Sequence, residues 1–197
     1  MSRAIILWLL CLVPLVSQSS SIRRMSMEEV AAQAELVFEG RVVEKRVIHR
    51  PGSRTLRTEV TFEVIDVLKG GLDERKLTLS FLGGEADGRK LEVSDLRIPA
   101  VGEQGIYFVE ARDRKLVNPL VGWHQGHYLL HREAGTGRAQ VRTLDGRPVF
   151  GISRKGPSVI SGISRSGGAA GVLVQPRKPL EMPMDAAQFK QRIRELM

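Results

Sequence analysis

Residues 34–70 carry the pattern that most constrains the fold: two runs of alternating apolar and polar side chains on either side of a turn. Such alternation has the period of a half-buried β-strand. Between the runs, Pro51-Gly52-Ser53 combines a fixed φ angle at proline with a free one at glycine, as turns require. We therefore predict a long antiparallel hairpin that begins a small β-barrel. The inward positions would be Leu36, Phe38, Gly40 and Val42, then Thr58, Val60, Phe62 and Val64.

Further alternating or apolar runs predict more strands. Residues 76–82 alternate, and residues 105–111 are apolar on both faces near their centre, as in a fully buried strand. Shorter strands are expected at residues 90–93, 126–132, 139–143 and 149–152, the last two as a terminal hairpin around Asp145-Gly146. Ser26 and Glu29 have the spacing of a capping box and predict a short helix as far as about Ala34.

The first residues have the anatomy of a secretory signal peptide. Arg3 forms a basic start, residues 4–16 are apolar, and small polar residues follow at 17–20. An apolar run of this length is too short to span a bilayer. We therefore assign residues 1–19 to a signal peptide and expect a periplasmic or extracellular protein. Cys11 is the single cysteine of the 197 residues, so the exported chain would contain none, which favours a bacterial origin.

The positive charge lies towards the end of the chain. The formal net charge is +8, and residues 147–197 carry nine Lys and Arg against three Asp and Glu. Such a tail either meets an anionic surface or serves as a solubilising segment. Residues 153–183 are rich in Ser, Gly, Arg and Pro and repeat GISR twice, which predicts a flexible basic linker after a barrel domain of residues 20–152. Residues 184–197 would form an amphipathic helix capped by Asp185 and Gln188.

Four short motifs carry a resemblance to a known family. They are Ala34-Glu35-Leu36-Val37, Gly40-Arg41-Val42-Val43, Thr61-Phe62-Glu63-Val64 and Leu68-Lys69-Gly70. In order and type they resemble the first strands of netrin-like domains and of tissue inhibitors of metalloproteinases. The chain is still more similar to uncharacterised exported bacterial proteins of the same plan, through Gly83-Gly84, Pro99, Gly102-Glu103 and Gln125-Gly126. The resemblance covers residues 26–132 and implies a five-stranded OB-type Greek-key barrel.

The resemblance stops short of the inhibitors' mechanism. Those inhibitors bind the catalytic zinc through a mature N-terminal cysteine, whereas this chain would begin near Ser20 and has no cysteine there. The chain can therefore share the fold of this family without the N-terminal cysteine that binds the zinc of the protease. Protease inhibition without an N-terminal cysteine stays open as an alternative function.

Candidate catalytic or metal-binding groups are few. His124, His127 and His131 cluster in sequence, but on a strand His127 and His131 would lie about 13 Å apart, too far to share a zinc ion. We interpret them as solvent-facing strand histidines. No nucleophile motif or converging carboxylate pair is present, so we predict a protein that is not an enzyme and has no cofactor or metal.

The expected function is therefore recognition by a binding module. A candidate binding rim is formed by Trp123, His124 and Gln125, although a tryptophan here could instead cap the end of the barrel. Nucleic acid is not the expected partner, because the predicted barrel is almost neutral and poor in aromatic residues. Another exported protein or an anionic envelope component is the predicted partner.

Overall fold

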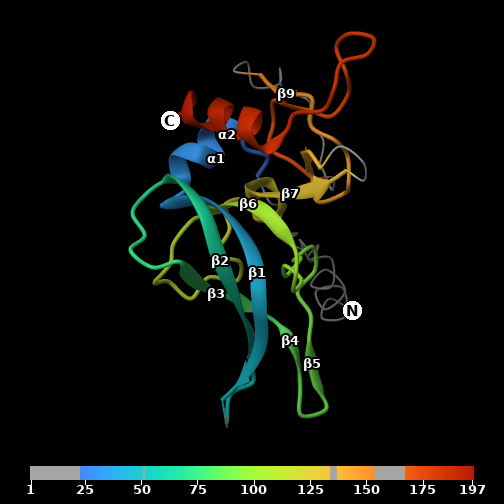
Figure 1. The fold of residues 1–197 in the computed structure, drawn as a ribbon. Helices are drawn as coiled ribbons and strands as arrows, with labels where there is room; N and C mark the ends of the chain where they lie inside the picture. The colour runs from blue at the N-terminus through green and yellow to red at the C-terminus, as the bar shows by residue number, and fades with distance from the viewer. Residues whose placement is uncertain (1–22, 51, 134–136, 154–166) are drawn as a thin grey trace, which may run out of the picture.

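The computed structural model describes residues 23–50, 52–133, 137–153 and 167–197. They form a mainly β structure whose largest unit is a six-stranded antiparallel sheet of order β3-β2-β1-β6-β7-β8 (Figure 1). The helices are α1 (Met27–Gln33), the short 3-10 helix η2 (Trp123–Gly126) and α2 (Ala186–Arg194). The strands are β1 (Leu36–His49), β2 (Leu56–Lys69), β3 (Lys76–Leu82), β4 (Gly84–Ala86), β5 (Arg89–Leu91), β6 (Gln104–Val109), β7 (His127–Arg132), β8 (Ala139–Arg142), β9 (Gly151–Ile152) and β10 (Val172–Leu173).

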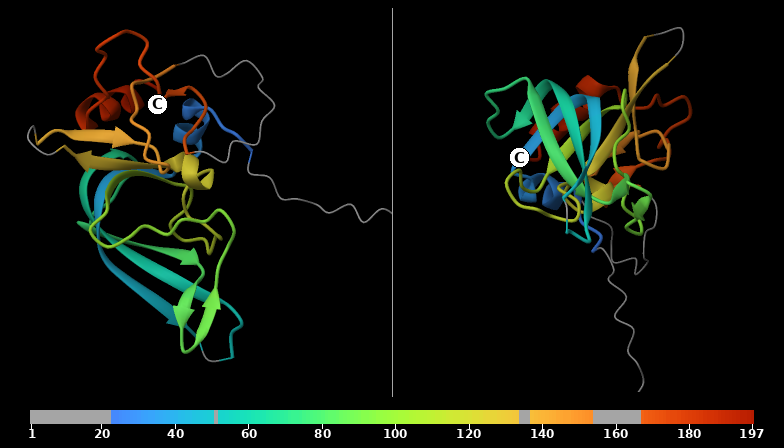
Figure 2. Two further views of the ribbon diagram at one scale, coloured as in Figure 1. Left: turned by 90° about the vertical axis from the view of Figure 1, so that its right-hand side faces the viewer. Right: turned by 90° about the horizontal axis from the view of Figure 1, so that it is seen from below.

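The predicted long hairpin is confirmed. Strands β1 and β2 pair antiparallel from Val37 opposite Lys69 to His49 opposite Leu56, with three register shifts on the way. One shift lies at Gly40, where an added Cβ would come within 2.7 Å of the Phe38 ring. Bulges and glycines bend a strand. The hairpin can therefore curve and extend to the end of the molecule opposite the helices (Figures 1 and 2).

Other predicted elements are also present. Strand β3 covers the predicted residues 76–82, and β6 overlaps the predicted strand of residues 105–111, with Gly105 to Val109 buried. Helix α1 has the complete capping box of Ser26 and Glu29. Asp87 and Gly88 both adopt positive φ angles at the turn of the small β4–β5 hairpin, as a tight hairpin turn requires.

Closure of the sheet into a barrel is not detected. Among the strands that the structure describes, no ladder joins β3 to β7 or β8. The predicted fold is therefore confirmed at the level of a mainly β structure with two α-helices, and the OB-type barrel stays a prediction.

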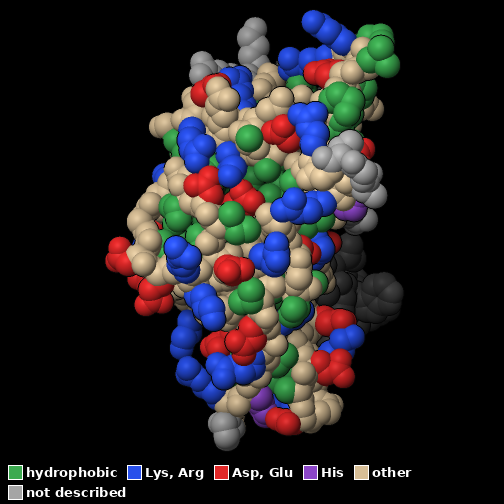
Figure 3. Space-filling model, in the orientation of Figure 1, with side chains coloured by type: hydrophobic (Ala, Val, Ile, Leu, Met, Phe, Trp, Pro, Cys, Tyr) green, Lys and Arg blue, Asp and Glu red, His purple; other side chains and the backbone are tan. Residues whose placement is uncertain are grey.

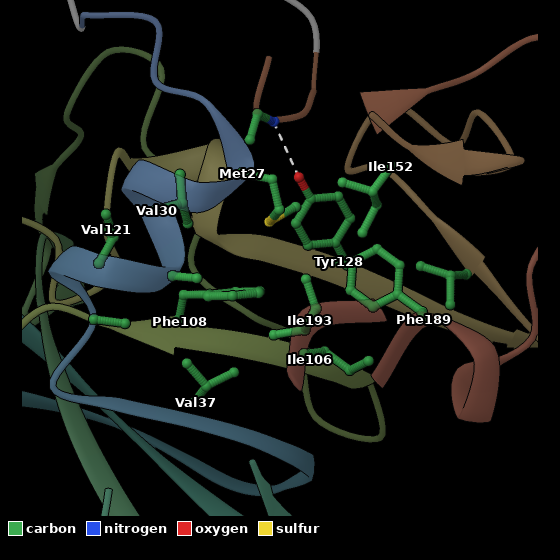
Figure 4. Close-up of a cluster of buried hydrophobic side chains, with 14 of the residues drawn as sticks. Met27, Val30, Val37, Ile106, Phe108, Val121, Tyr128, Ile152, Phe189 and Ile193 are labelled. Atoms are coloured by element: carbon green, nitrogen blue, oxygen red, sulfur yellow. Dashed lines mark hydrogen bonds between the residues drawn. The ribbon is translucent and has the colours of Figure 1, made fainter. Parts of the chain in front are cut away.

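Two hydrophobic clusters hold the described residues together. One lies on the inner face of the hairpin and includes Phe38, Phe62 and Tyr107, whose rings pack with centroids 4.7–5.4 Å apart. The other lies beneath the helices and includes Phe108, Tyr128 and Phe189 (Figure 4). The two faces of the sheet are therefore buried in different ways. On one face, side chains of the hairpin pack against one another, and the other face is covered by α1 and α2.

The predicted flexible linker of residues 153–183 differs from the structure in its described part. Ala169 and Ala170 are buried, and the Ala169 N–H donates to the Tyr128 hydroxyl oxygen over 3.0 Å (Figure 4). The predicted terminal hairpin is present around Asp145-Gly146, where Arg142 and Pro148 form a bridge and the Val149 N–H donates to the Val141 carbonyl at 2.9 Å. Beyond it, strand β10 pairs with β9, so Ile152 pairs with this segment instead. The composition is polar, but small residues can fill the space beside a buried tyrosine. Residues 1–22, which hold the predicted signal peptide, lie outside the described part.

The C-terminal helix is confirmed and belongs to the core. Asp185 and Gln188 form the predicted capping box of α2, and Phe189 and Ile193 are fully buried. Within the described residues, no helix combines the length and apolar character needed to cross a membrane.

Candidate anion-binding site

A surface hollow arises where strands of unequal length meet. Strand β6 begins at Gln104, opposite Arg41 of β1, whereas β7 continues to Arg132 in pairing with β8. The β7–β8 ribbon therefore projects past the start of β6. The hollow beside this projection has a volume of about 600 Å³.

Arginines dominate the charge of this hollow. Its lining includes Arg41 from β1, Arg132 from β7 and Arg142 from β8, with His131 beside them and Glu103 as the single carboxylate. We call Arg41, Arg132 and Arg142 the arginine set. Figure 3 shows blue and purple side chains together over β7, in the orientation of Figure 1.

The arginine set has no carboxylate partner among the described residues. Arg132 donates only to the Gly137 carbonyl at 3.5 Å, and Arg142 only to the Gly146 carbonyl at 3.3 Å. The buried Nε of Arg142 makes no hydrogen bond within the described part of the chain. Guanidinium groups favour planar anions such as carboxylates and phosphates. The hollow can therefore accept an anionic group from outside.

The one carboxylate in the hollow is occupied elsewhere. Glu103 lies 2.6 Å from Arg97 through Oε2 and 2.9 Å from Nε2 of the buried His127 through Oε1. The Tyr107 ring packs against His127, with centroids 4.7 Å apart. Because Arg97 balances the charge of Glu103, the arginine set keeps its positive charge.

The polar atoms of this buried group are incompletely satisfied. The Glu103–His127 contact is close but poorly aligned for hydrogen bonding, and His127 Nδ1 and Tyr107 Oη have no partner among the described residues. Burial lowers the pKa of the His127 imidazole, in spite of the opposing attraction of Glu103. His127 is therefore a neutral group behind the hollow.

The prediction of solvent-facing histidines is wrong for His127, which is 1% exposed. Strand β6 covers it, since Tyr107 is its register partner. His131 is exposed because β6 has ended before that level, and His124 is partly buried in η2 rather than in a strand. Within the described residues, no group of three or more His, Cys, Asp or Glu side chains could hold a metal ion.

The predicted rim of Trp123, His124 and Gln125 is wrong for Gln125, which is 2% exposed. Its side chain accepts from the Met25 N–H at 2.7 Å and donates to the Arg23 carbonyl at 2.9 Å. Gln125 thus fastens the segment before α1 to η2. Trp123 and His124 are only partly buried, and whether they bind a partner stays untested.

A larger hollow, of about 900 Å³, lies over β1, β2 and β3. Its charges are mixed: Glu44, Glu59, Asp73 and Glu74 line it together with Arg46, Lys76 and Arg112. Arg46 and Glu59 pair at 3.0 Å, and Arg112 pairs with Glu35 at 2.6 Å. Because both signs of charge line it, this hollow selects less strongly for a ligand of one charge than the arginine set does.

Sequence analysis missed the arginine set. The excess of positive charge was assigned to residues 147–197, whereas Arg41, Arg132 and Arg142 all precede them. Only the successive pairing of β1 with β6, of β6 with β7 and of β7 with β8 brings them to one hollow. In comparisons with known proteins, no family model, curated protein or solved structure matches this chain.

Proposed function

We propose that this protein is an exported, non-enzymatic binding module that recognises an anionic group on another exported protein or on an envelope component. The proposal rests on the arginine set, which lines one hollow and has no carboxylate partner among the described residues. Export rests on the signal-peptide pattern of residues 1–19.

An OB-type barrel is the proposed scaffold. In favour of it, the order β3-β2-β1-β6-β7 is the one that a five-stranded Greek-key barrel has when opened between its third and fifth strands. The alternative, a protease-inhibitor-like module that acts without an N-terminal cysteine, stays a prediction.

Titration calorimetry tests the anion site with two probes, an oligoglutamate peptide and a short polyphosphate chain. The variant Arg41→Gln/Arg132→Gln/Arg142→Gln should lose at least about tenfold in affinity, since each charge-assisted hydrogen bond contributes roughly 1.5–3 kcal/mol. Binding should also weaken with added salt. The preferred probe would indicate whether a carboxylate-bearing or phosphate-bearing partner is recognised.

A matched control removes the same charge elsewhere. Arg24, Arg50 and Arg54 are exposed and do not line the hollow, so Arg24→Gln/Arg50→Gln/Arg54→Gln should retain most of the affinity. Equal losses of affinity in the two triple variants would refute a specific site and would mean that the net charge alone attracts the anionic probes. Should Arg142→Gln lower the melting temperature, the double variant Arg41→Gln/Arg132→Gln provides the same test.

A further inference from the structure

Residues 175–182 form a projecting loop, which we call the apical loop. Its base is held on both sides: Val172 and Leu173 pair with β9, and the Met184 N–H donates to the Val149 carbonyl at 2.7 Å. The Val141 N–H in turn donates to the Met184 carbonyl at 3.0 Å. Figures 1 and 2 show this segment, in red tones, extending away from the body at the end opposite the hairpin tip. The loop therefore projects from a fixed base.

The tip of the apical loop is both apolar and basic. Residues 175–180 are all exposed; Leu180 is 98% exposed and Met182 62% exposed. Arg177 and Lys178 lie beside them, and the charged groups of their side chains form no ion pair among the described residues. In Figure 3 green and blue side chains meet at this upper right corner. The tip therefore presents two exposed apolar side chains next to two cations.

The single acidic residue of the loop is turned onto the loop's own backbone. The Glu181 carboxylate accepts from the N–H groups of Arg177 and Lys178, and the Glu181 N–H donates to the Lys178 carbonyl at 3.2 Å. Leu180, inside this turn, has a φ angle of +67°, in the left-handed region that leucine rarely adopts. The turn thus presents Leu180 outward and withdraws the one negative charge from the tip.

We propose that the apical loop docks on an anionic lipid bilayer. Leu180 and Met182 would enter the boundary between headgroups and acyl chains, while Arg177 and Lys178 would pair with lipid phosphates, the arrangement of surface-bound membrane segments. A protein partner suits the loop less well, because specific protein interfaces bury about 800 Å² on each side and a narrow projecting tip offers far less. The inference stands apart from the arginine set, which lines a different surface.

Vesicle co-sedimentation tests the proposal with the purified protein. Vesicles of phosphatidylglycerol mixed with phosphatidylcholine should bind it, and vesicles of phosphatidylcholine alone should bind it much more weakly. The variant Leu180→Ser/Met182→Ser should reduce binding roughly tenfold or more, because burial of one large apolar side chain already changes affinity by that factor. Arg177→Gln/Lys178→Gln should reduce binding to anionic vesicles more than it reduces binding to neutral vesicles.

Matched controls separate the loop from general effects. Val101 is 61% exposed elsewhere, so Val101→Ser should leave vesicle binding unchanged, as should Lys45→Gln/Arg50→Gln at exposed positions of the hairpin. The loop variants should keep the wild-type melting temperature, since their side chains are exposed. Failure of the wild-type protein to bind anionic vesicles, or wild-type binding by Leu180→Ser/Met182→Ser, would overturn the proposal. Loss of binding only in the arginine-set variant would overturn it too, and would assign lipid contact to the hollow.

Discussion

At the scale of single residues, the buried imidazole of His127 has the most unusual environment. It is packed against Tyr107 and lies 2.9 Å from Glu103, yet burial lowers its pKa. An unfolded chain would return this imidazole to water, where the pKa is about 6.5. Protons are therefore taken up by His127 more readily in the unfolded chain than in the folded one.

This difference predicts a pH dependence of stability. As the pH falls from about 6.5 towards the lowered folded pKa, the unfolded chain binds the extra proton, and the free energy of unfolding should decrease. Urea unfolding at about pH 7.5 and pH 5.5 measures the change. His127→Gln should flatten this dependence, and His131→Gln, at an exposed position, should preserve it. Identical slopes for wild type and His127→Gln would show that the imidazole charges freely in the folded state.

The same histidines show what a strand pattern can predict at this scale. Alternation places His127 and His131 on one face of β7, and that parity follows from sequence. Their opposite exposure does not, because β6 begins at Gln104 and covers only the first part of β7. The length of a neighbouring strand decides which of the two is buried.

At the scale of elements, α2 is fastened to the sheet by an ionic group. Lys190 Nζ lies 2.7 Å from Glu39 and 2.8 Å from Asp66, and Arg194 adds a contact to Asp66 at 3.1 Å. Glu39 is 6% exposed and also accepts from Gln104. The helix therefore contacts both strands of the long hairpin through charge as well as through its apolar face.

Removing Lys190 should destabilise the fold because it leaves the Glu39 carboxylate buried without a cation. Lys190→Ala should lower the free energy of unfolding by roughly 2–4 kcal/mol, as expected for half of a mostly buried ion pair. Arg194→Ala is the matched control: its pair is exposed, and the loss should stay below about 1 kcal/mol. Chemical denaturation measures both, and similar losses for the two variants would argue against the buried pairing.

Elements with local signals were predictable, and those without were not. Both α-helices have capping boxes, and β2 and β3 alternate, so each can be recognised from its own residues. Strands β9 and β10 contain two residues each and pair although they lie about 20 residues apart in the sequence. Nothing local specifies such short strands. They adjoin a segment that is held by long-range contacts: the Ala169 N–H donates to the Tyr128 hydroxyl oxygen, and the Ala170 N–H donates to the Met25 carbonyl.

At the scale of the whole molecule, the first and last helices of the described part share one core. Met27 and Val30 of α1 and Phe189 and Ile193 of α2 belong to the same buried cluster, seen in Figure 4. The Met27 N–H also donates to the Ala170 carbonyl at 3.1 Å. The predicted division into a barrel ending at residue 152 and a separate C-terminal helix therefore does not describe how the core is built.

Truncation after Pro183 should strongly destabilise the protein. Loss of one large buried aromatic side chain costs about 3–5 kcal/mol, a large part of a typical stability of about 5–15 kcal/mol, and truncation removes Phe189 and Ile193 together. Phe189→Ala should show the smaller effect in the full chain, and removal of Met197 alone, which is 49% exposed, should have little effect. Thermal or urea unfolding measures the series. An unchanged midpoint after truncation would mean that the sheet folds independently of α2.

The sequence by itself determined the local elements: the long hairpin, strand β3, the buried strand β6 and two capped helices. Their signals lie in period, capping and turn residues within one segment. Only the tertiary structure decided which strands lie side by side. That arrangement buries His127 and Gln125 and packs residues 169–173 against the rest of the core. It also brings Arg41, Arg132 and Arg142 to one hollow. The physical reason is that burial and the sharing of one hollow depend on contacts between residues far apart in sequence, which no local pattern encodes.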